Sequence, residues 1–247
     1  MAYQMTVSPD FSPSYIAGWF IFNTWLQKQI DEAIHLELYD SFAAQRKSIV
    51  DGKVDLIFAN PYDAAMLIRK KGFVAVSAPV NRPDEVVVCV HADSNVERVE
   101  DLSENCSVAM THAPEINNLG MIMLEPADLT ANNVNISHYE NYVLVAKSLM
   151  TKQADVGFFL EETYANMSKI IRSQTKPIVT SQISVIKHIF LVGPSLAQYV
   201  EEIRSLLNDM HNNVKGLSVL ESLSFAKLEN QTKEDSEFMI DLIDTLI

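Results

Sequence analysis

Apolar and polar residues follow two patterns along this chain, one typical of buried strands and the other of amphipathic helices. Short and almost wholly apolar runs such as Val86–Val90 predict buried strands. The stretch from Tyr15 to Ala33 instead carries apolar residues at the spacing of one helix face: Trp19, Phe22, Leu26 and Ile30. Strand and helix signals follow one another from end to end, and this order predicts an α/β fold.

The predicted strands cover residues 3–7, 35–39, 73–80, 85–90, 107–110, 135–138, 178–180 and 186–192. The predicted helices cover residues 15–33, 41–51, 116–124, 141–152, 162–172, 195–212, 217–223 and 236–246. Two prolines place a turn at Ser8–Pro13, because proline has no backbone N–H to donate to a helix or a central strand. The segment Asn230–Asp235 has the composition of a solvated loop.

Two stretches about a hundred residues apart repeat one pattern. Gly52–Ala65 and Lys152–Ala165 each contain a polar turn, an Asp, a short apolar strand and polar residues that open a helix. Ligands of open α/β sheets sit outside the carboxyl ends of the strands. The repeat therefore predicts two α/β lobes that face a shared ligand cleft. Asp55 and Asp155 precede their strands, so we expect them to be turn or capping residues away from the ligand.

The order of these elements predicts a discontinuous first lobe and an inserted second lobe. Lobe 1 is expected to contain residues 1–87 plus 185–247, and lobe 2 residues 88–184. Two crossings between the lobes would form a hinge that lets them close on a ligand.

Composition and charge narrow the classes of function. The chain has 247 residues, 48% of them hydrophobic, and contains only 7 glycines. Neither G-x-G-x-x-G nor G-x-x-x-x-G-K-[ST] occurs, so no nucleotide cofactor is expected. The formal net charge of −13 argues against nucleic-acid binding, which depends on Lys and Arg at phosphates.

The two cysteines and the N-terminus leave the compartment open. Cys89 and Cys106 favour buried free thiols, with a disulfide as the alternative, and neither has the spacing of a metal site. No apolar run reaches the roughly 20 residues of a membrane span. The N-terminus lacks the basic and apolar regions of a signal peptide, which indicates either a cytosolic protein or a mature chain.

Several sequence blocks, taken in order, carry a family resemblance. They are GKVDLIFANPYDAA, VVVCVHADSNVERVEDL, ADVGFF, TSQISVIKHIFLV and the final VLESLSFAKL…EDSEFMIDLI. The chain resembles the phosphate, phosphite and phosphonate-binding components of ABC importers, which have the two-lobed type II periplasmic-binding-protein fold. The resemblance spans essentially the whole chain. It implies a periplasmic protein, expected to be monomeric, that delivers a small anionic or zwitterionic ligand to a membrane permease.

The resemblance also implies an oxyanion held by hydroxyls and by N–H groups at helix N-termini. Asn60, Pro61 and Tyr62 match the first-lobe position of the family, where a proline and an aromatic residue follow the strand. The second-lobe position is normally a Ser/Thr-rich turn ending in glycine. This chain has Thr111–Asn117 there, with one hydroxyl and no glycine, and Glu115 would compete with a bound anion for the helix dipole.

The predicted ligand-binding residues all follow strands, where they would face the cleft. They are Asp10, Phe11, Ser12, Asn60, Pro61, Tyr62, Thr111, His112, Tyr139, Asn141, Glu161 and Glu162. Purely structural roles are the alternative for several of these residues. Asn60 would cap a helix with Pro61 after it, and Thr111 and His112 would form a surface turn. Glu161 or Glu162 would favour the start of a helix. Where the family binds aminoalkylphosphonates, acidic side chains pair with the ammonium group, which the resemblance implies for Glu161 and Glu162.

The leading hypothesis is a solute-binding protein that closes over a phosphorus oxyanion, without catalysis and without a metal or cofactor. One alternative is a sensor that signals through a membrane partner, or a degenerate member that works by protein contact. Another is an enzyme on the same fold, for which His112 with Glu115, or His138, are the candidate groups.

Overall fold

The computed structural model describes residues 2–246 and divides the chain into two compact α/β units. Unit 1 runs to Pro83 and continues over Val185–Asp244, and unit 2 comprises Asp84–Ser184 together with the residues from Thr245 onward. The sequence placed the first crossing after residue 87, whereas the division falls after Pro83. The reason is that β5 (Val86–His91) pairs with two strands of unit 2 from its first residues onward.

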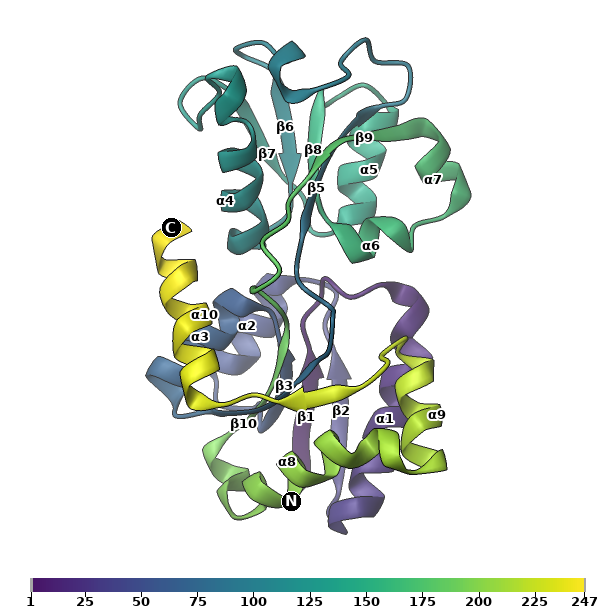
Figure 1. The fold of residues 1–247 in the computed structure, drawn as a ribbon, viewed down its shortest axis with the longest axis vertical. Coiled ribbons are helices and arrows are strands. Elements are labelled where there is room, and N and C mark those ends of the chain that lie inside the picture. The colour runs from purple at the N-terminus through teal and green to yellow at the C-terminus, as the bar shows by residue number, and fades with distance from the viewer. Residues whose placement is uncertain (1, 247) are drawn as a thin grey trace. The chain divides into compact units, whose positions relative to one another are not determined.

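A six-stranded sheet forms the centre of unit 1, in the order β11-β4-β10-β3-β1-β2 (Figure 1). The strands are β1 (Tyr3–Val7), β2 (Ile34–Leu38), β3 (Leu56–Ala59), β4 (Val74–Pro79), β10 (Ile189–Val192) and β11 (Leu228–Asn230). β1 runs parallel to β2 and β3, whereas β10 is antiparallel to β3 and β4. The amino end of β10 therefore lies beside the carboxyl end of β3, and Ile189 is opposite Ala59.

Helices cover both faces of this sheet. They are α1 (Ile16–Ile30), α2 (Phe42–Val50), α3 (Pro61–Lys71), α8 (Val200–Asp209), α9 (Val214–Ser222) and α10 (Lys233–Leu246). Right-handed crossovers place α1 on one face and α2 and α3 on the other. The main hydrophobic core joins α1, α8 and α9 to the sheet, and Trp19 lies within it in contact with Phe58 and Phe190.

Unit 2 is built on a five-stranded sheet in the order β7-β6-β8-β5-β9 (Figure 1). Its other strands are β6 (Ser107–Met110), β7 (Asn135–His138), β8 (Val156–Leu160) and β9 (Thr175–Thr180). Its helices are α4 (Pro114–Met123), α5 (Tyr142–Met150), α6 (Glu161–Ala165) and α7 (Lys169–Gln174). The single helix predicted over 162–172 is thus two helices, because Ser168 caps a new one by accepting the Ile171 N–H.

The sequence repeat appears in both units as one structural device. The Asp55 carboxylate accepts the Gln4 N–H at the start of β1, at 2.8 Å. In the same way the Asp155 carboxylate accepts the Ser107 N–H at the start of β6, at 2.7 Å. Both aspartates therefore fasten the amino ends of neighbouring parallel strands, at the end of the sheet away from the predicted ligand residues.

Several local predictions need correction. β11 was missed, since its first residues were unassigned and Asn230 was placed in a loop. Residues 186–188 precede β10 instead of forming its start, and α8 is flanked by short 3-10 helices at 194–199 and 210–212. Cys89 and Cys106 are buried free thiols, as the first of the two predictions for them stated.

Residues 2–246 contain neither a helix able to span a membrane nor a cluster of metal-binding side chains. None of the helices within residues 2–246 combines the length and the apolar character that crossing a membrane requires. Over the same residues, no three His, Cys, Asp or Glu side chains gather into a group that could hold a metal ion.

Candidate functional site

Polar side chains collect at the carboxyl ends of the parallel strands in unit 1. Ser8 follows β1 and Asn60 follows β3, and the pairing of these strands brings the two residues together. The Asn60 side-chain amide donates to Ser8 Oγ at 3.0 Å. His188 joins them because it precedes the antiparallel strand β10, whose amino end lies at the same edge.

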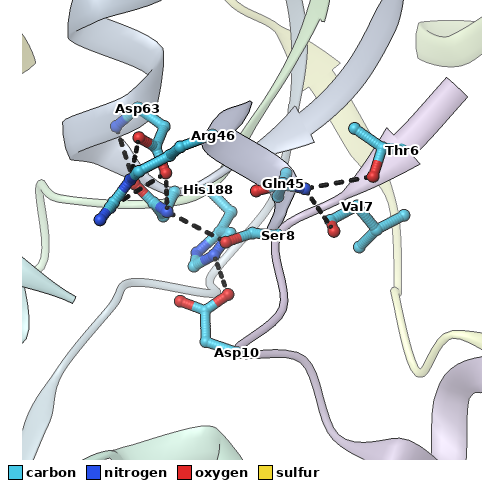
Figure 2. A network of polar contacts seen from close by, with 9 residues as sticks. Thr6, Val7, Ser8, Asp10, Gln45, Arg46, Asp63 and His188 are labelled. Carbon is cyan, nitrogen blue, oxygen red and sulfur yellow. Dashed lines mark hydrogen bonds and ion pairs between the residues drawn. The ribbon is translucent and has the colours of Figure 1, made fainter. Parts of the chain in front are cut away.

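Asn60 caps α3 and also anchors the ion pair between the buried Asp63 and Arg46, two residues that Figure 2 shows. Its Oδ1 accepts the Asp63 N–H at 2.8 Å, and its Nδ2 donates to Asp63 Oδ2 at 2.8 Å. The Arg46 guanidinium on α2 donates to both oxygens of the same carboxylate, at 2.8 and 3.2 Å. The capping role that the sequence left open for Asn60 is present, with Pro61 as the first helical residue.

Asp10 lies deep in unit 1 and forms an ion pair with His188 (Figure 2). His188 Nε2 is 3.0 Å from Asp10 Oδ1, and the imidazole packs against the Phe58 ring. Burial alone would raise the pKa of Asp10, but the charge and hydrogen bond of His188, with further hydrogen bonds from Ser8 and the Asp10 backbone, hold the pKa below its ordinary value. His188 and Ser8 therefore both contact this carboxylate.

The neighbouring predicted residues differ in exposure. Ser12 is buried and caps the short helix at 13–15, and Phe11 packs on the edge of the core. Tyr62, in the first turn of α3, keeps 36% of its surface exposed. Of these three side chains, Tyr62 has the most surface available to a ligand.

In unit 2, the turn between β6 and α4 presents a buried hydroxyl in front of a helix N-terminus. Thr111 is 1% exposed, and its Oγ1 has no hydrogen-bond partner among residues 2–246. No side chain in the described chain caps α4, and Pro114 supplies no N–H at its first position. The remaining N–H groups of the first turn, with the Thr111 hydroxyl, form a set of donors suited to an oxyanion. Glu115 lies in that same turn, as the sequence predicted, and the structure shows that it is also buried.

His112 and His138 stack on each other at the ends of β6 and β7. Their ring centroids are 5.1 Å apart with an interplanar angle of 12°. Desolvation, followed by the charge of His112, lowers the pKa of His138. The parallel arrangement turns the two ring faces toward each other, which does not direct their nitrogen atoms at a common point.

The other predicted residues of unit 2 also lie at the carboxyl ends of its strands. The Tyr139 N–H donates to Met110 O at 2.8 Å, and Asn141 caps α5 by accepting the Leu144 N–H at 3.1 Å. Glu161 and Glu162 form the first turn of α6. The pairing of β6, β7 and β8 brings all four to the edge that also holds Thr111 and His112.

Sequence reasoning missed three residues of these networks: Arg46, Asp63 and His188. Arg46 is in a short amphipathic helix, and the residue pattern of that helix does not indicate an ion-pair partner on α3. The sequence predicts a strand over residues 186–192 but not its antiparallel direction, which brings His188 beside Asn60. The predicted return of the chain after residue 185 is the signal that could have identified it.

A comparison with protein families gives one match that covers most of the chain. Residues 5–236 match the model described as "ABC transporter, phosphonate, periplasmic substrate-binding protein". A search of curated proteins gives no match.

Solved structures with the same fold cover nearly all of the chain. PhnD1 from Prochlorococcus marinus, in complex with methylphosphonate, aligns at TM-score 0.84 and 10% identity, over 99% of this chain and 97% of that one. A phosphonate-transporter binding protein from Pseudomonas aeruginosa aligns at 0.78 and 13%, over 98% and 87%. The sulphonate-binding protein SsuA from Escherichia coli aligns at 0.70 and 13%, over 99% and 91%. The predicted type II periplasmic-binding-protein fold is confirmed.

Proposed function

We propose a ligand and a partner for this chain, which belongs to the family of periplasmic phosphonate-binding proteins of ABC transporters. Members of this family are substrate-binding proteins rather than enzymes. The proposed ligand is a small phosphorus oxyanion of the phosphonate type, and the proposed partner is the membrane permease of an importer. An extracytoplasmic location and a monomeric state belong to the same proposal.

The observation that carries the proposal is the turn between β6 and α4. A buried hydroxyl such as that of Thr111 is expensive to leave without a hydrogen bond, so such groups are normally paired. An oxyanion at the uncapped N-terminus of α4 would accept from this hydroxyl and from the backbone N–H groups at once. In unit 1 the helix α3 is already capped by Asn60, so we take the half-exposed Tyr62 in its first turn as the candidate ligand contact of that unit.

Acidic side chains at the same strand ends favour a ligand that also carries a positive charge. Glu115 lies in the first turn of α4, and Glu161 and Glu162 lie in the first turn of α6. A dianion without a counter-charge would be repelled by these carboxylates, whereas an ammonium group would be attracted. We therefore rank 2-aminoethylphosphonate above methylphosphonate, and methylphosphonate above phosphate.

A thermal-shift experiment on the purified chain tests the proposal. The panel is 2-aminoethylphosphonate, methylphosphonate, phosphite, phosphate, sulfate, an alkanesulfonate and glycine. A ligand at about 100 times its dissociation constant adds about 2.7 kcal/mol to the free energy of unfolding. For a protein of this size that shifts the melting temperature by roughly 5–10 °C. A response to the phosphonates in the stated order supports the proposal, and a response confined to sulfonates, or to none of these compounds, contradicts it.

A further inference from the structure

The Arg46 guanidinium is fixed from three sides in unit 1. Its Nε and Nη2 donate to Asp63 Oδ1 and Oδ2 at 2.8 and 3.2 Å. Its Cζ lies 5.0 Å from the ring centroid of Phe42 and 5.2 Å from that of Tyr62. A planar guanidinium that is bound in a two-point contact and stacked on aromatic rings has little freedom to rotate.

The carboxylate that holds Arg46 is itself anchored to the sheet. Asp63 is 1% exposed, its N–H donates to Asn60 Oδ1, and its Oδ2 accepts from Asn60 Nδ2, both at 2.8 Å. Asn60 also donates to Ser8 Oγ at 3.0 Å, which ties the network to the end of β1. The position of the guanidinium is therefore set by the ends of β1 and β3 and not by the flexible side chain of an exposed arginine.

The Tyr62 ring contacts this network through the Arg46 guanidinium. Its side chain is more than one third exposed, and its hydroxyl makes no hydrogen bond within the described residues. The ring face rests on the Arg46 guanidinium, which is a favourable cation–π arrangement. Without that contact, a half-exposed tyrosine would have to be ordered by the ligand, and ordering one such side chain weakens affinity by roughly two- to tenfold.

We propose that Arg46 is a positioning residue for the ligand contact made by Tyr62. Asp63 holds the guanidinium and balances its charge, so Arg46 acts through the Tyr62 ring and not as a charge presented to the ligand. A lysine at the same position keeps the positive charge but lacks the planar fork and the flat stacking surface. This inference rests on the proposed function, because it takes Tyr62 as a contact to a phosphonate.

The test combines ligand affinity with a measurement of the Tyr62 ring itself. Wild type, Arg46→Lys, Tyr62→Phe and the double variant are titrated with methylphosphonate by calorimetry. Ring mobility in the ligand-free protein is measured by NMR on ¹³C-tyrosine, with Tyr62→Phe to assign the signal. Arg69→Lys is the matched control, because Arg69 pairs with Asp244 on the exposed surface of the same unit. Asp63→Asn provides a second way to release the guanidinium.

The expected result is a loss of affinity of about three- to tenfold in Arg46→Lys, with increased Tyr62 ring mobility. The loss should nearly disappear in the Tyr62→Phe background, and Arg69→Lys should match wild type. Unchanged ring mobility in both Arg46→Lys and Asp63→Asn would overturn the inference, as would an equal loss of affinity with and without the Tyr62 hydroxyl. If wild type binds no phosphonate, the proposed function fails, while the ring measurement still decides whether Arg46 orders Tyr62.

Discussion

Replacing Thr111 by valine should raise stability and weaken ligand binding at the same time. Valine keeps the shape of threonine and removes the hydroxyl, which is buried and has no hydrogen-bond partner among residues 2–246. An unpaired buried hydroxyl costs about 1–3 kcal/mol in mutational data. Thr111→Val should therefore stabilise the ligand-free protein by about 1 kcal/mol or more, which is about 2–4 °C in melting temperature at this size.

Binding should change in the opposite direction. In the proposed complex the Thr111 hydroxyl donates to a charged oxygen, and such hydrogen bonds contribute about 1.5–3 kcal/mol. Their loss corresponds to an affinity for 2-aminoethylphosphonate that is about tenfold to a hundredfold weaker. Calorimetric titration and thermal denaturation with and without the ligand measure the two effects on the same samples.

The chain offers a matched control for the stability effect. Thr6 is equally buried, but its Oγ1 accepts a hydrogen bond from Gln45 Nε2 at 3.2 Å. Thr6→Val should therefore lower the melting temperature, whereas Thr111→Val should raise it. Thr111→Ser keeps the hydroxyl and should bind ligand like wild type to within a few-fold. A Thr111→Val protein that is destabilised like Thr6→Val, or that binds as tightly as wild type, would refute the reasoning.

Three further predictions concern packing, pH and thiol chemistry. Gly120→Ala places a Cβ 2.4 Å from the Phe158 ring. The overpacking should cost about 1–3 kcal/mol, which outweighs the gain in helix propensity of about 0.5–1 kcal/mol. The melting temperature should therefore fall, and a raised melting temperature would contradict this prediction. Burial would raise the pKa of Asp10, but contact with His188 keeps this pKa below 3.8. Asp10 therefore stabilises the fold above that pH, and its contribution is lost as the pH falls through the lower pKa of the folded state. Asp10→Asn should flatten the acid limb of a plot of melting temperature against pH. Burial raises the pKa of the Cys89 thiol to about 12, so mass spectrometry should find it unmodified by a thiol reagent at pH 8 until the protein unfolds.

The fold could be predicted from the sequence because its strands are short, apolar and bounded by residues that favour turns. The strands Ser107–Met110 and Asn135–His138 have the predicted limits, and Gly72 ends α3 with a positive φ, as a glycine after a lysine-rich turn predicts. The secondary-structure prediction failed where a strand forms only because it pairs with another strand. β11 is a three-residue strand that exists because it pairs with β4, and its own sequence, Leu-Glu-Asn, has no strand signal.

The candidate site was predictable only as a set of positions. Strand ends in a parallel sheet gather at one edge, so the sequence could place Asn60 at that edge in unit 1 and Thr111 at the corresponding edge in unit 2 before any contact was known. The contacts themselves depend on side chains from other elements. Arg46 reaches Asp63 from a separate helix, and His188 reaches Asp10 across 178 positions in sequence, a separation that local pattern does not encode.

The charge arrangement in unit 1 indicates how such a protein could select its ligand. Two basic side chains lie at its strand ends, and each is paired with a carboxylate: Arg46 with Asp63, and His188 with Asp10. A basic group paired with a carboxylate adds little net field around it. In unit 2 the donors proposed for the oxyanion, the Thr111 hydroxyl and the helix N–H groups, are neutral as well. Neutral donors recognise the geometry of a tetrahedral group but tolerate differences in its total charge. In a chain with a net charge of −13, discrimination between a phosphonate, a sulfonate and a zwitterion then falls to the acidic residues around those donors.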